Sequence, residues 1–291
     1  MKNYTSLKST VTLSNGVEIP VVGFGTWQSP SGETAYRAVL EALRCGYRHI
    51  DTATAYGNEE SVGEALKDYL EESGEKRENL FITTKLANPD HGYERAKAAI
   101  DKSLSALGLD YIDLYLIHWP NPIAFRSEWR EIDRECWRAM EEAYRAGKIR
   151  ALGLSNFWPH HIDNILEEAE IMPVVNQIKF CPGINQKEVA AYSREKNMVL
   201  EAYSPMGTGG MFRNDAMTAL SRKYGRSIAQ LCIRYALQSG YIPLPKSVTP
   251  ERIEENTHVF DFEIADEDMA LIAAVNPEGI AAARNPDETT F

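Results

Sequence analysis

The sequence predicts a (β/α)8 barrel, and three observations support that fold class. Eight short apolar runs, rich in β-branched residues, recur along the 291 residues. Amphipathic helical stretches separate these runs, and the connections between them are short. Strands that are apolar almost throughout are typical of a parallel sheet with both faces covered, and regular alternation with helices is typical of a closed barrel. A doubly wound parallel sheet is the alternative that the same alternation allows.

The expected elements follow one another along the chain. The strands are expected at residues 21–27, 47–53, 80–86, 112–120, 151–156, 174–180, 199–205 and 241–247. The helical stretches are 31–46, 92–110, 132–148, 159–170, 185–197 and 227–240. Within one of them, Ala96, Ile100 and Leu104 fall on a single helix face, and Gly108 follows as a stop signal.

Two segments lie outside this alternation. Residues 11–20 contain Asn15-Gly16 between apolar residues, which predicts a β-hairpin, expected at the N-terminal end of the barrel. The region from Met206 to Tyr224 is long and contains an extra helical piece. Long loops at the carboxyl ends of barrel strands are where substrates are usually held. No linker interrupts the pattern, so residues 1–291 are expected to form a single domain.

Composition narrows the classes of partner. The chain has 31 Lys and Arg against 42 Asp and Glu, a formal net charge of −11. Such an acidic surface repels phosphate backbones, so nucleic acid is not expected as a partner. The four scattered cysteines indicate reduced thiols and no bound metal. Without a signal-peptide segment or an apolar run of about 18 residues, we expect a cytoplasmic protein with no membrane span.

Polar side chains gather where the expected strands end. Asp51 ends the second strand and Tyr56 follows in its loop, while Lys85 and His118 end the third and fourth strands. Each also has an ordinary structural explanation, such as a buried Asp51–Lys85 ion pair, a core histidine or a loop tyrosine. Because active sites of these barrels lie at the carboxyl ends of the strands, their joint occurrence there favours a catalytic site.

These four residue types suit proton donation to an oxygen. A phenol has a pKa of about 10, and a nearby ammonium favours the phenolate and lowers that pKa. Tyr56 is therefore expected to be a general acid, Lys85 to lower its pKa, and Asp51 to anchor the lysine. His118 would hydrogen-bond and orient a carbonyl group. The predicted reaction is reduction of a carbonyl, with the hydride supplied by a cofactor.

The expected cofactor site lies near the eighth strand. No Rossmann fingerprint is present, since the Gly-Phe-Gly at 23–25 is only part of one. Lys246, Ser247 and Arg252 instead lie around Thr249-Pro250, which predicts a helix start. A helix start with basic side chains favours an anion, and an acidic chain needs such a local cluster to hold one.

Together these stretches resemble the aldo-keto reductase superfamily. The resemblance covers almost the whole chain and rests on the motifs GYRHIDTATAYGNE, LFITTKL, YIDLYLIHWP, GLSNF, NQI, AYSP and IPLPKSVTPERIEEN. It implies a (β/α)8 barrel that uses NADPH without a Rossmann domain. It also implies that Asp51, Tyr56, Lys85 and His118 are a catalytic tetrad.

The resemblance implies roles for further residues. The cofactor positions would be Ser155, Asn156 and Gln177 for the nicotinamide carboxamide, Tyr203 for stacking on its ring, Ser204 and Met206 for the pyrophosphate, Lys246, Ser247 and Arg252 for the 2′-phosphate, and Glu255 and Asn256 for the adenine, with Val248 and Thr249 in the same segment. Trp27 and Trp119 would line the substrate pocket together with Tyr56 and His118.

The predicted function is NADPH-dependent reduction of a small aldehyde, α-dicarbonyl or keto sugar acid. The chain resembles the compact microbial branch of the superfamily, and we expect a monomer or weak dimer. Two alternatives use the same residues differently. One is a non-catalytic, NADPH-sensing regulatory subunit of the same fold. The other is a Schiff-base barrel enzyme in which Lys85 is the nucleophile.

Overall fold

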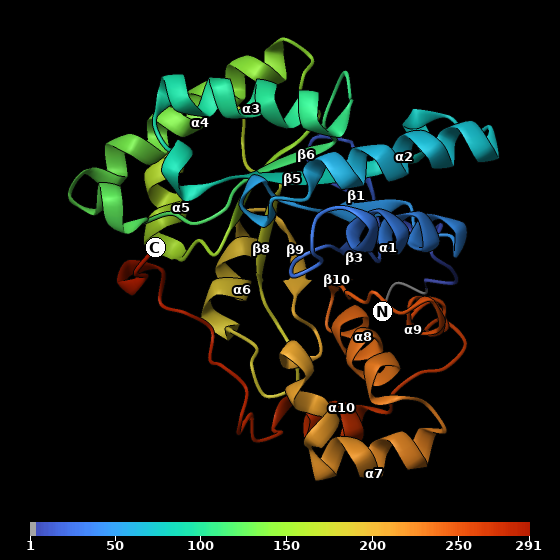
Figure 1. The fold of residues 1–291 in the computed structure, drawn as a ribbon. Coiled ribbons are helices and arrows are strands. Elements are labelled where there is room, and N and C mark those ends of the chain that lie inside the picture. The colour runs from blue at the N-terminus through green and yellow to red at the C-terminus, as the bar shows by residue number, and fades with distance from the viewer. Residues whose placement is uncertain (1–3) are drawn as a thin grey trace.

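A computed structural model describes residues 4–291 and confirms the predicted barrel (Figure 1). Eight parallel strands follow one another in sequence order. They are β3 (Phe24–Gly25), β4 (His49–Asp51), β5 (Phe81–Leu86), β6 (Leu114–Ile117), β7 (Leu152–Ser155), β8 (Val175–Lys179), β9 (Val199–Tyr203) and β10 (Tyr241–Leu244). Every residue of β5 through β8 is buried, because one face of each strand fills the barrel and the other packs against helices.

The barrel closes between its first and last strands through two backbone hydrogen bonds. The Gly23 N–H donates to the Pro243 carbonyl at 3.0 Å, and the Gly25 N–H donates to the Pro245 carbonyl at 2.9 Å. A Cβ atom at position 23 would lie 2.5 Å from the Leu244 side chain. It would also lie 2.6 Å from the His49 ring, so any side chain at position 23 would displace its neighbours.

The first barrel strand is shorter than the expected 21–27, and the hairpin explains why. The Val21 N–H pairs with the Ser9 carbonyl at 3.0 Å, so the chain is still beside the hairpin at this point. The hairpin itself, β1 (Thr10–Thr12) and β2 (Glu18–Pro20), forms where Asn15-Gly16 predicts it. Its apolar side chains Leu13 and Ile19 pack with Phe81, Leu114 and Val174 at the amino ends of the barrel strands, as expected.

Helices surround the barrel. They are α1 (Glu33–Arg44), α2 (Glu59–Ser73), α3 (Tyr93–Leu107), α4 (Trp129–Arg145), α5 (Pro159–Leu166), α6 (Lys187–Glu195), α7 (Asp215–Tyr224), α8 (Ile228–Gln238), α9 (Pro250–Glu255) and α10 (Asp266–Ala273). Helix α3 buries Ala96, Ile100 and Leu104 and ends at Gly108, whose φ of 64° suits a residue without Cβ. Helix α9 begins at Pro250 as predicted, although the Thr249 side chain makes no capping bond.

Two segments reach the carboxyl end of the barrel from outside the repeat. The region after β9 forms the 3-10 segment Gly207–Arg213 and then α7, as predicted. After α10 the chain continues as a tail, the red segment of Figure 1, which includes the 3-10 turn Pro286–Glu288 and ends at Phe291. The course of this tail was not predicted from the sequence.

All four cysteines are free thiols. Within residues 4–291, none of the helices has both the length and the apolar character that crossing a bilayer requires.

Candidate active site

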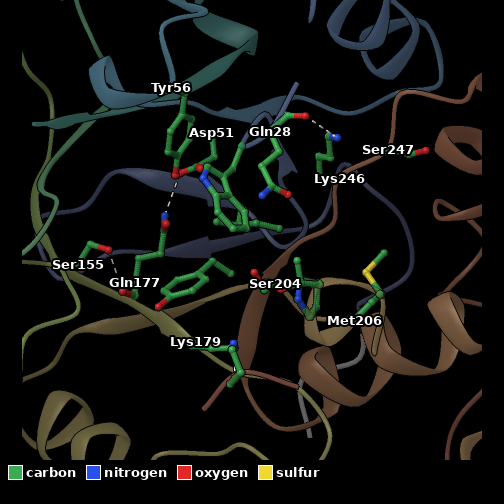
Figure 2. Close-up of a pocket in the computed structure, with 18 of the residues that line it drawn as sticks. Gln28, Asp51, Tyr56, Ser155, Gln177, Lys179, Ser204, Met206, Lys246 and Ser247 are labelled. Carbon is green, nitrogen blue, oxygen red and sulfur yellow. Dashed lines mark hydrogen bonds between the residues drawn. The ribbon is translucent and has the colours of Figure 1, made fainter. Parts of the chain in front are cut away.

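A cavity of about 720 Å³ lies at the carboxyl ends of the strands and contains most of the predicted site (Figure 2). The predicted residues that line it are Trp27, Asp51, Tyr56, His118, Trp119, Ser155, Asn156, Gln177, Tyr203, Ser204, Met206, Lys246, Ser247, Arg252, Glu255 and Asn256. Lys85 is fully buried beneath this wall. Val248 and Thr249 do not line the cavity, so a cofactor role for them remains a prediction.

The Lys85 ammonium links Asp51 to Tyr56. Its Nζ donates to the two carboxylate oxygens of Asp51 at 2.7 and 2.8 Å and to the Thr52 carbonyl at 2.8 Å. A further contact joins Nζ to the Tyr56 hydroxyl at 3.3 Å. Lys85 is fully buried and Asp51 is 3% exposed. A buried ammonium needs such a set of partners to remain charged, and here they hold it directly beside the phenol.

The pKa shifts in this cluster differ partly from the expectation. Burial acts to lower the pKa of Lys85, but the charge of Asp51 and the contact with Tyr56 outweigh it, so the pKa is raised. Burial also raises the pKa of Tyr56, and Lys85 lowers it only in part. Lys85 acts in the predicted direction, yet the expected net lowering of the Tyr56 pKa is not found, because desolvation of the phenolate outweighs the ammonium. Tyr56 therefore keeps its proton at neutral pH.

His118 is a neutral imidazole beside the phenol. Burial, followed by the charges of Lys85 and His91, lowers the pKa of His118 well below its usual value. Its ring meets the Tyr56 ring edge to face, with centroids 5.7 Å apart. The His118 carbonyl accepts a hydrogen bond from Asn156 Nδ2 at 3.1 Å, which fixes the backbone at this strand end. A neutral ring can offer an N–H to a substrate oxygen without bringing a charge into the cavity.

Gln177 connects Asp51 to a buried carboxyl group that the sequence analysis missed. Its Nε2 donates to Asp51 Oδ2 at 2.9 Å and to Glu201 Oε2 at 2.8 Å. Both side-chain amide hydrogens are thus used, and the side-chain Oε1 of Gln177 is left for the cavity that the residue lines. Burial and then the charge of Asp51 raise the pKa of Glu201 to about 8. Glu201 is therefore largely a neutral carboxylic acid at neutral pH.

Several cavity residues hold a left-handed backbone although they carry a Cβ. They are Gln28, Asn156, Ser204 and Thr208, with φ values of 59°, 63°, 51° and 56°. Such conformations are costly and concentrate at functional sites. In this conformation, the Asn156 side chain meets Tyr203, and its Oδ1 accepts a hydrogen bond from the Tyr203 hydroxyl at 2.8 Å. The bond fixes the orientation of the Tyr203 ring at the cavity wall.

The far end of the cavity carries the basic cluster that the sequence predicts. Lys246 Nζ donates to the Gln28 carbonyl at 3.0 Å, and burial lowers the pKa of Lys246. Among residues 4–291, neither Lys246 nor Arg252 has an ion-pair partner. Beside them, the buried Oδ1 of Asn256 has no hydrogen-bond partner. This end of the cavity thus offers free cations and a free acceptor to a ligand.

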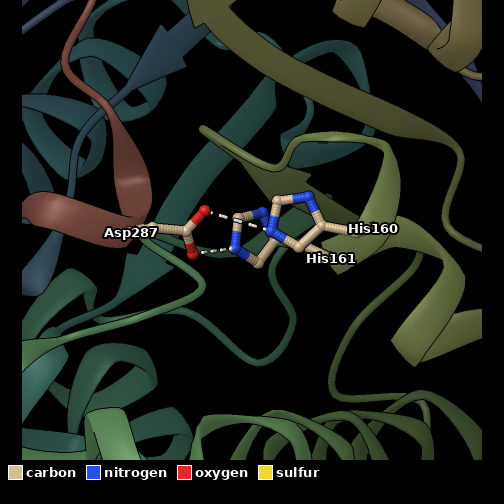
Figure 3. Close-up of side chains that lie close together, drawn as sticks. All are labelled: His160, His161 and Asp287. Atoms are coloured by element: carbon tan, nitrogen blue, oxygen red, sulfur yellow. Dashed lines mark hydrogen bonds and ion pairs between the residues drawn. The ribbon is translucent and has the colours of Figure 1, made fainter.

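The C-terminal tail supplies part of the wall that the sequence analysis did not anticipate. Ala281, Ala282, Arg284 and Phe291 all line the cavity. The tail is held by Asp287, whose carboxylate accepts from His161 Nε2 at 2.9 Å and from Asn121 Nδ2 at 3.0 Å, and lies 3.1 Å from His160 Nε2 (Figure 3).

These side chains are close enough to surround a metal ion, but the proton on His161 opposes that function. The Trp158 N–H donates to His161 Nδ1 at 3.2 Å. Nδ1 is therefore the acceptor nitrogen, and Nε2 carries the proton that faces Asp287. A histidine that ligates a metal through Nε2 usually donates a proton from Nδ1 instead. The His161–Asp287 contact is best described as a hydrogen bond that anchors the tail.

Comparison with known proteins gives concordant matches. A model described as the Aldo/keto reductase family matches residues 21–277. A glyoxal reductase from Bacillus subtilis (strain 168) is 46% identical over 287 residues, which is 99% of this chain and 99% of that protein.

Solved structures match at similar levels. MGS-M4, an aldo-keto reductase enzyme from a Medee basin deep-sea metagenome library, is 41% identical with a TM-score of 0.88, over 97% of this chain and 100% of that chain. A Bombyx mori aldo-keto reductase in complex with NADP is 35% identical with a TM-score of 0.82, over 91% of this chain and 92% of that chain.

Proposed function

Since the chain belongs to the aldo/keto reductase family, we propose that it reduces small aldehydes or ketones to alcohols with NADPH, and that Tyr56 donates the proton. The observation that carries this proposal is the 3.3 Å contact between Lys85 Nζ and the Tyr56 hydroxyl at the cavity wall. The glyoxal reductase relative and the NADP-bound Bombyx mori structure support the choice of a carbonyl substrate and of NADPH.

In this mechanism the four central residues act on one substrate oxygen. Tyr56 gives its proton to the carbonyl oxygen as the alcohol forms, and the Lys85 ammonium stabilises the phenolate that remains. Asp51 keeps Lys85 charged and in place. Neutral His118 donates a hydrogen bond that holds the carbonyl oxygen near the phenol. A positioned general acid typically contributes about 10²–10⁴-fold to the rate.

NADPH, when bound, supplies the hydride that the carbonyl carbon accepts. The residues of this chain fit its nicotinamide end. The side-chain Oε1 of Gln177 is available to accept from the carboxamide, because Asp51 and Glu201 occupy the side-chain amide hydrogens. The Tyr203 ring, held by Asn156, offers a flat face for stacking. Ser155 would help to hold the carboxamide, and Ser204 and Met206 the pyrophosphate.

The chain also fits the adenosine end of the cofactor. Lys246, Ser247 and Arg252 would bind the 2′-phosphate, which gives the two unpaired cations an anionic partner. The unpartnered Oδ1 of Asn256 would accept from the adenine amino group, with Glu255 beside it. The protein is therefore expected to prefer NADPH to NADH.

The Schiff-base alternative is disfavoured by the state of Lys85. A nucleophilic lysine must be neutral and must reach the substrate. Lys85 is fully buried, donates hydrogen bonds to Asp51 and Thr52, and has a raised pKa. The regulatory-subunit alternative predicts cofactor binding without turnover. The complete proton-donor arrangement of Tyr56 and Lys85 argues against it.

NADPH oxidation with glyoxal, methylglyoxal and simple aldehydes tests the proposal. Tyr56→Phe removes the transferable proton and keeps the ring, so it should lower kcat by about 10²-fold or more while NADPH still binds. Tyr144→Phe on α4 is the matched control for loss of a phenol away from the cavity. Wild-type protein that binds NADPH but reduces no carbonyl would support the regulatory alternative instead.

A further inference from the structure

The cavity contains a second group of cations, separate from Lys246 and Arg252. Lys179 is the last residue of β8 and lies opposite Tyr203 in the barrel register. Arg284 lies on the C-terminal tail, and both side chains line the cavity. Figure 2 shows Lys179 on the opposite side of the cavity from Tyr56.

Lys179 is an unusual residue to bury without a carboxylate. It is 6% exposed, and its Nζ donates only to the Ala281 carbonyl at 2.6 Å. In the part of the chain that the structure describes, neither Lys179 nor Arg284 forms an ion pair. Burial and then the charge of Arg284 lower the pKa of Lys179, so each side chain lies within electrostatic reach of the other. Buried ammonium groups are normally paired, and Lys179 has no such partner, while Arg284 is exposed and open to a ligand.

The tail holds Arg284 in place over the cavity. Its guanidinium lies 5.0 Å from the centroid of the Phe291 ring, and the Phe291 ring meets Trp119 with centroids 5.4 Å apart. The backbone is fixed on one side by the Lys179–Ala281 bond and on the other by the Asp287 anchor (Figure 3). The Arg284 guanidinium is therefore connected through the Phe291 ring to Trp119, which follows His118.

Carboxylates within the cavity do not neutralise these cations. Asp51 is already bound to Lys85. Glu255 lies on α9, beside the cluster of Lys246 and Arg252. The Arg284 guanidinium lies instead over the apolar ring of Phe291. In a chain of net charge −11, two unpaired cations at this end of the cavity form a local positive site.

We propose that Arg284 and Lys179 form a carboxylate-recognition subsite, and that the physiological substrate is a carbonyl compound that carries a carboxylate. Arg284 would bind the carboxylate directly through its planar guanidinium, while Lys179 adds positive potential and holds the tail. This inference rests on the proposed reduction of carbonyls. The competing anions belong to the cofactor: its 2′-phosphate, assigned to Lys246, Ser247 and Arg252, and its pyrophosphate, assigned to Ser204 and Met206.

A pair of near-isosteric aldehydes tests the subsite. 4-Carboxybenzaldehyde and 4-formylbenzamide differ in charge and hardly in shape. Wild-type protein should show a kcat/KM at least about tenfold higher for the acid, as expected for one charge-assisted contact. Arg284→Met should remove most of this ratio, Arg284→Lys should keep part of it, and Lys179→Met should reduce it. Added salt should also reduce the ratio.

The controls separate the subsite from the proposed reaction. Arg222→Met, at an exposed position of α7 that does not line the cavity, should leave the acid-to-amide ratio unchanged. Equal kcat/KM values for the two aldehydes in the wild type would overturn the subsite while the reductase function stands. A loss of NADPH affinity in Arg284→Met that accounts for its lower activity would assign the cations to the cofactor and also overturn the subsite.

A binding measurement covers the case in which neither aldehyde turns over. Calorimetric titration of the NADP⁺-bound protein with 4-(hydroxymethyl)benzoate and with its amide does not depend on catalysis. About tenfold tighter binding of the acid, lost in Arg284→Met, would support the subsite even if the proposed reaction failed. Equal affinities for acid and amide would refute it.

Discussion

Glu201→Gln should make the stability of the protein less sensitive to alkaline pH. Glu201 has a pKa of about 8 in the folded chain, against an ordinary value of 4.5. Because the folded value is raised, the neutral acid contributes its full stability below about pH 4.5 and loses it as pH rises through about 8. Glutamine can still accept the bond from Gln177 Nε2 through its carbonyl oxygen and does not titrate.

The size of the effect follows from the two pKa values. Each tenfold change in proton affinity corresponds to about 1.4 kcal/mol, so the maximum penalty is on the order of 5 kcal/mol. Between about pH 5 and about pH 9, the free energy of unfolding of Glu201→Gln should rise by about 4 kcal/mol relative to the wild type. Groups that titrate alike in both proteins cancel in this difference.

Urea unfolding followed by tryptophan fluorescence, at about pH 5 and about pH 9, measures this difference. Glu64→Gln, at an exposed position of α2, controls for the loss of a carboxylate and should not show the pH-dependent gain. If the difference between Glu201→Gln and the wild type were the same at both pH values, Glu201 would be ionised in the folded protein. The description of Gln177 as bound between one carboxylate and one neutral acid would then be wrong.

Two further predictions concern the proton donor and the cofactor. Lys85→Met should abolish aldehyde reduction and lower the free energy of unfolding by about 3–5 kcal/mol, because Asp51 is left buried and unpaired; an active variant with wild-type stability in urea would exclude both roles of Lys85. Arg252→Ala should weaken NADPH binding at least about tenfold and leave NADH binding almost unchanged. Fluorescence titration with both cofactors checks this, and equal losses would rule out a 2′-phosphate contact.

The fold and the meeting of Asp51, Tyr56, Lys85 and His118 were predictable because both depend on local patterns. Each barrel strand is a short apolar run, and parallel strands place their carboxyl ends at the same end of the barrel. Asp51, Lys85 and His118 stand at those ends, so their meeting follows from the alternation of strand and helix. The 3.3 Å contact between Lys85 and Tyr56 supports that reasoning.

The missed features depend on contacts between distant parts of the chain. Glu201 is an acidic residue within an apolar run, and nothing local shows that barrel closure leaves it beside Gln177. The raised pKa of Tyr56 likewise reflects the burial of a complete cavity wall. The tail has no periodic pattern, and the partners that place Arg284 include Lys179, more than a hundred residues earlier. The sequence does signal both positions in one respect, because Lys179 and Glu201 are ionisable residues within apolar strands.

The closure of the barrel at Gly23 and Gly25 links folding to ligand binding, because the edges that close the barrel also line the cavity. The two edges that meet there come from opposite ends of the sequence, and such long-range pairing is entropically costly and slow to form. Gly25 and Leu244, one from each edge, both line the cavity, and the Lys246–Gln28 bond crosses between the same edges. A ligand bound there contacts both edges, so it stabilises the closure of the barrel, and its release removes that stabilisation.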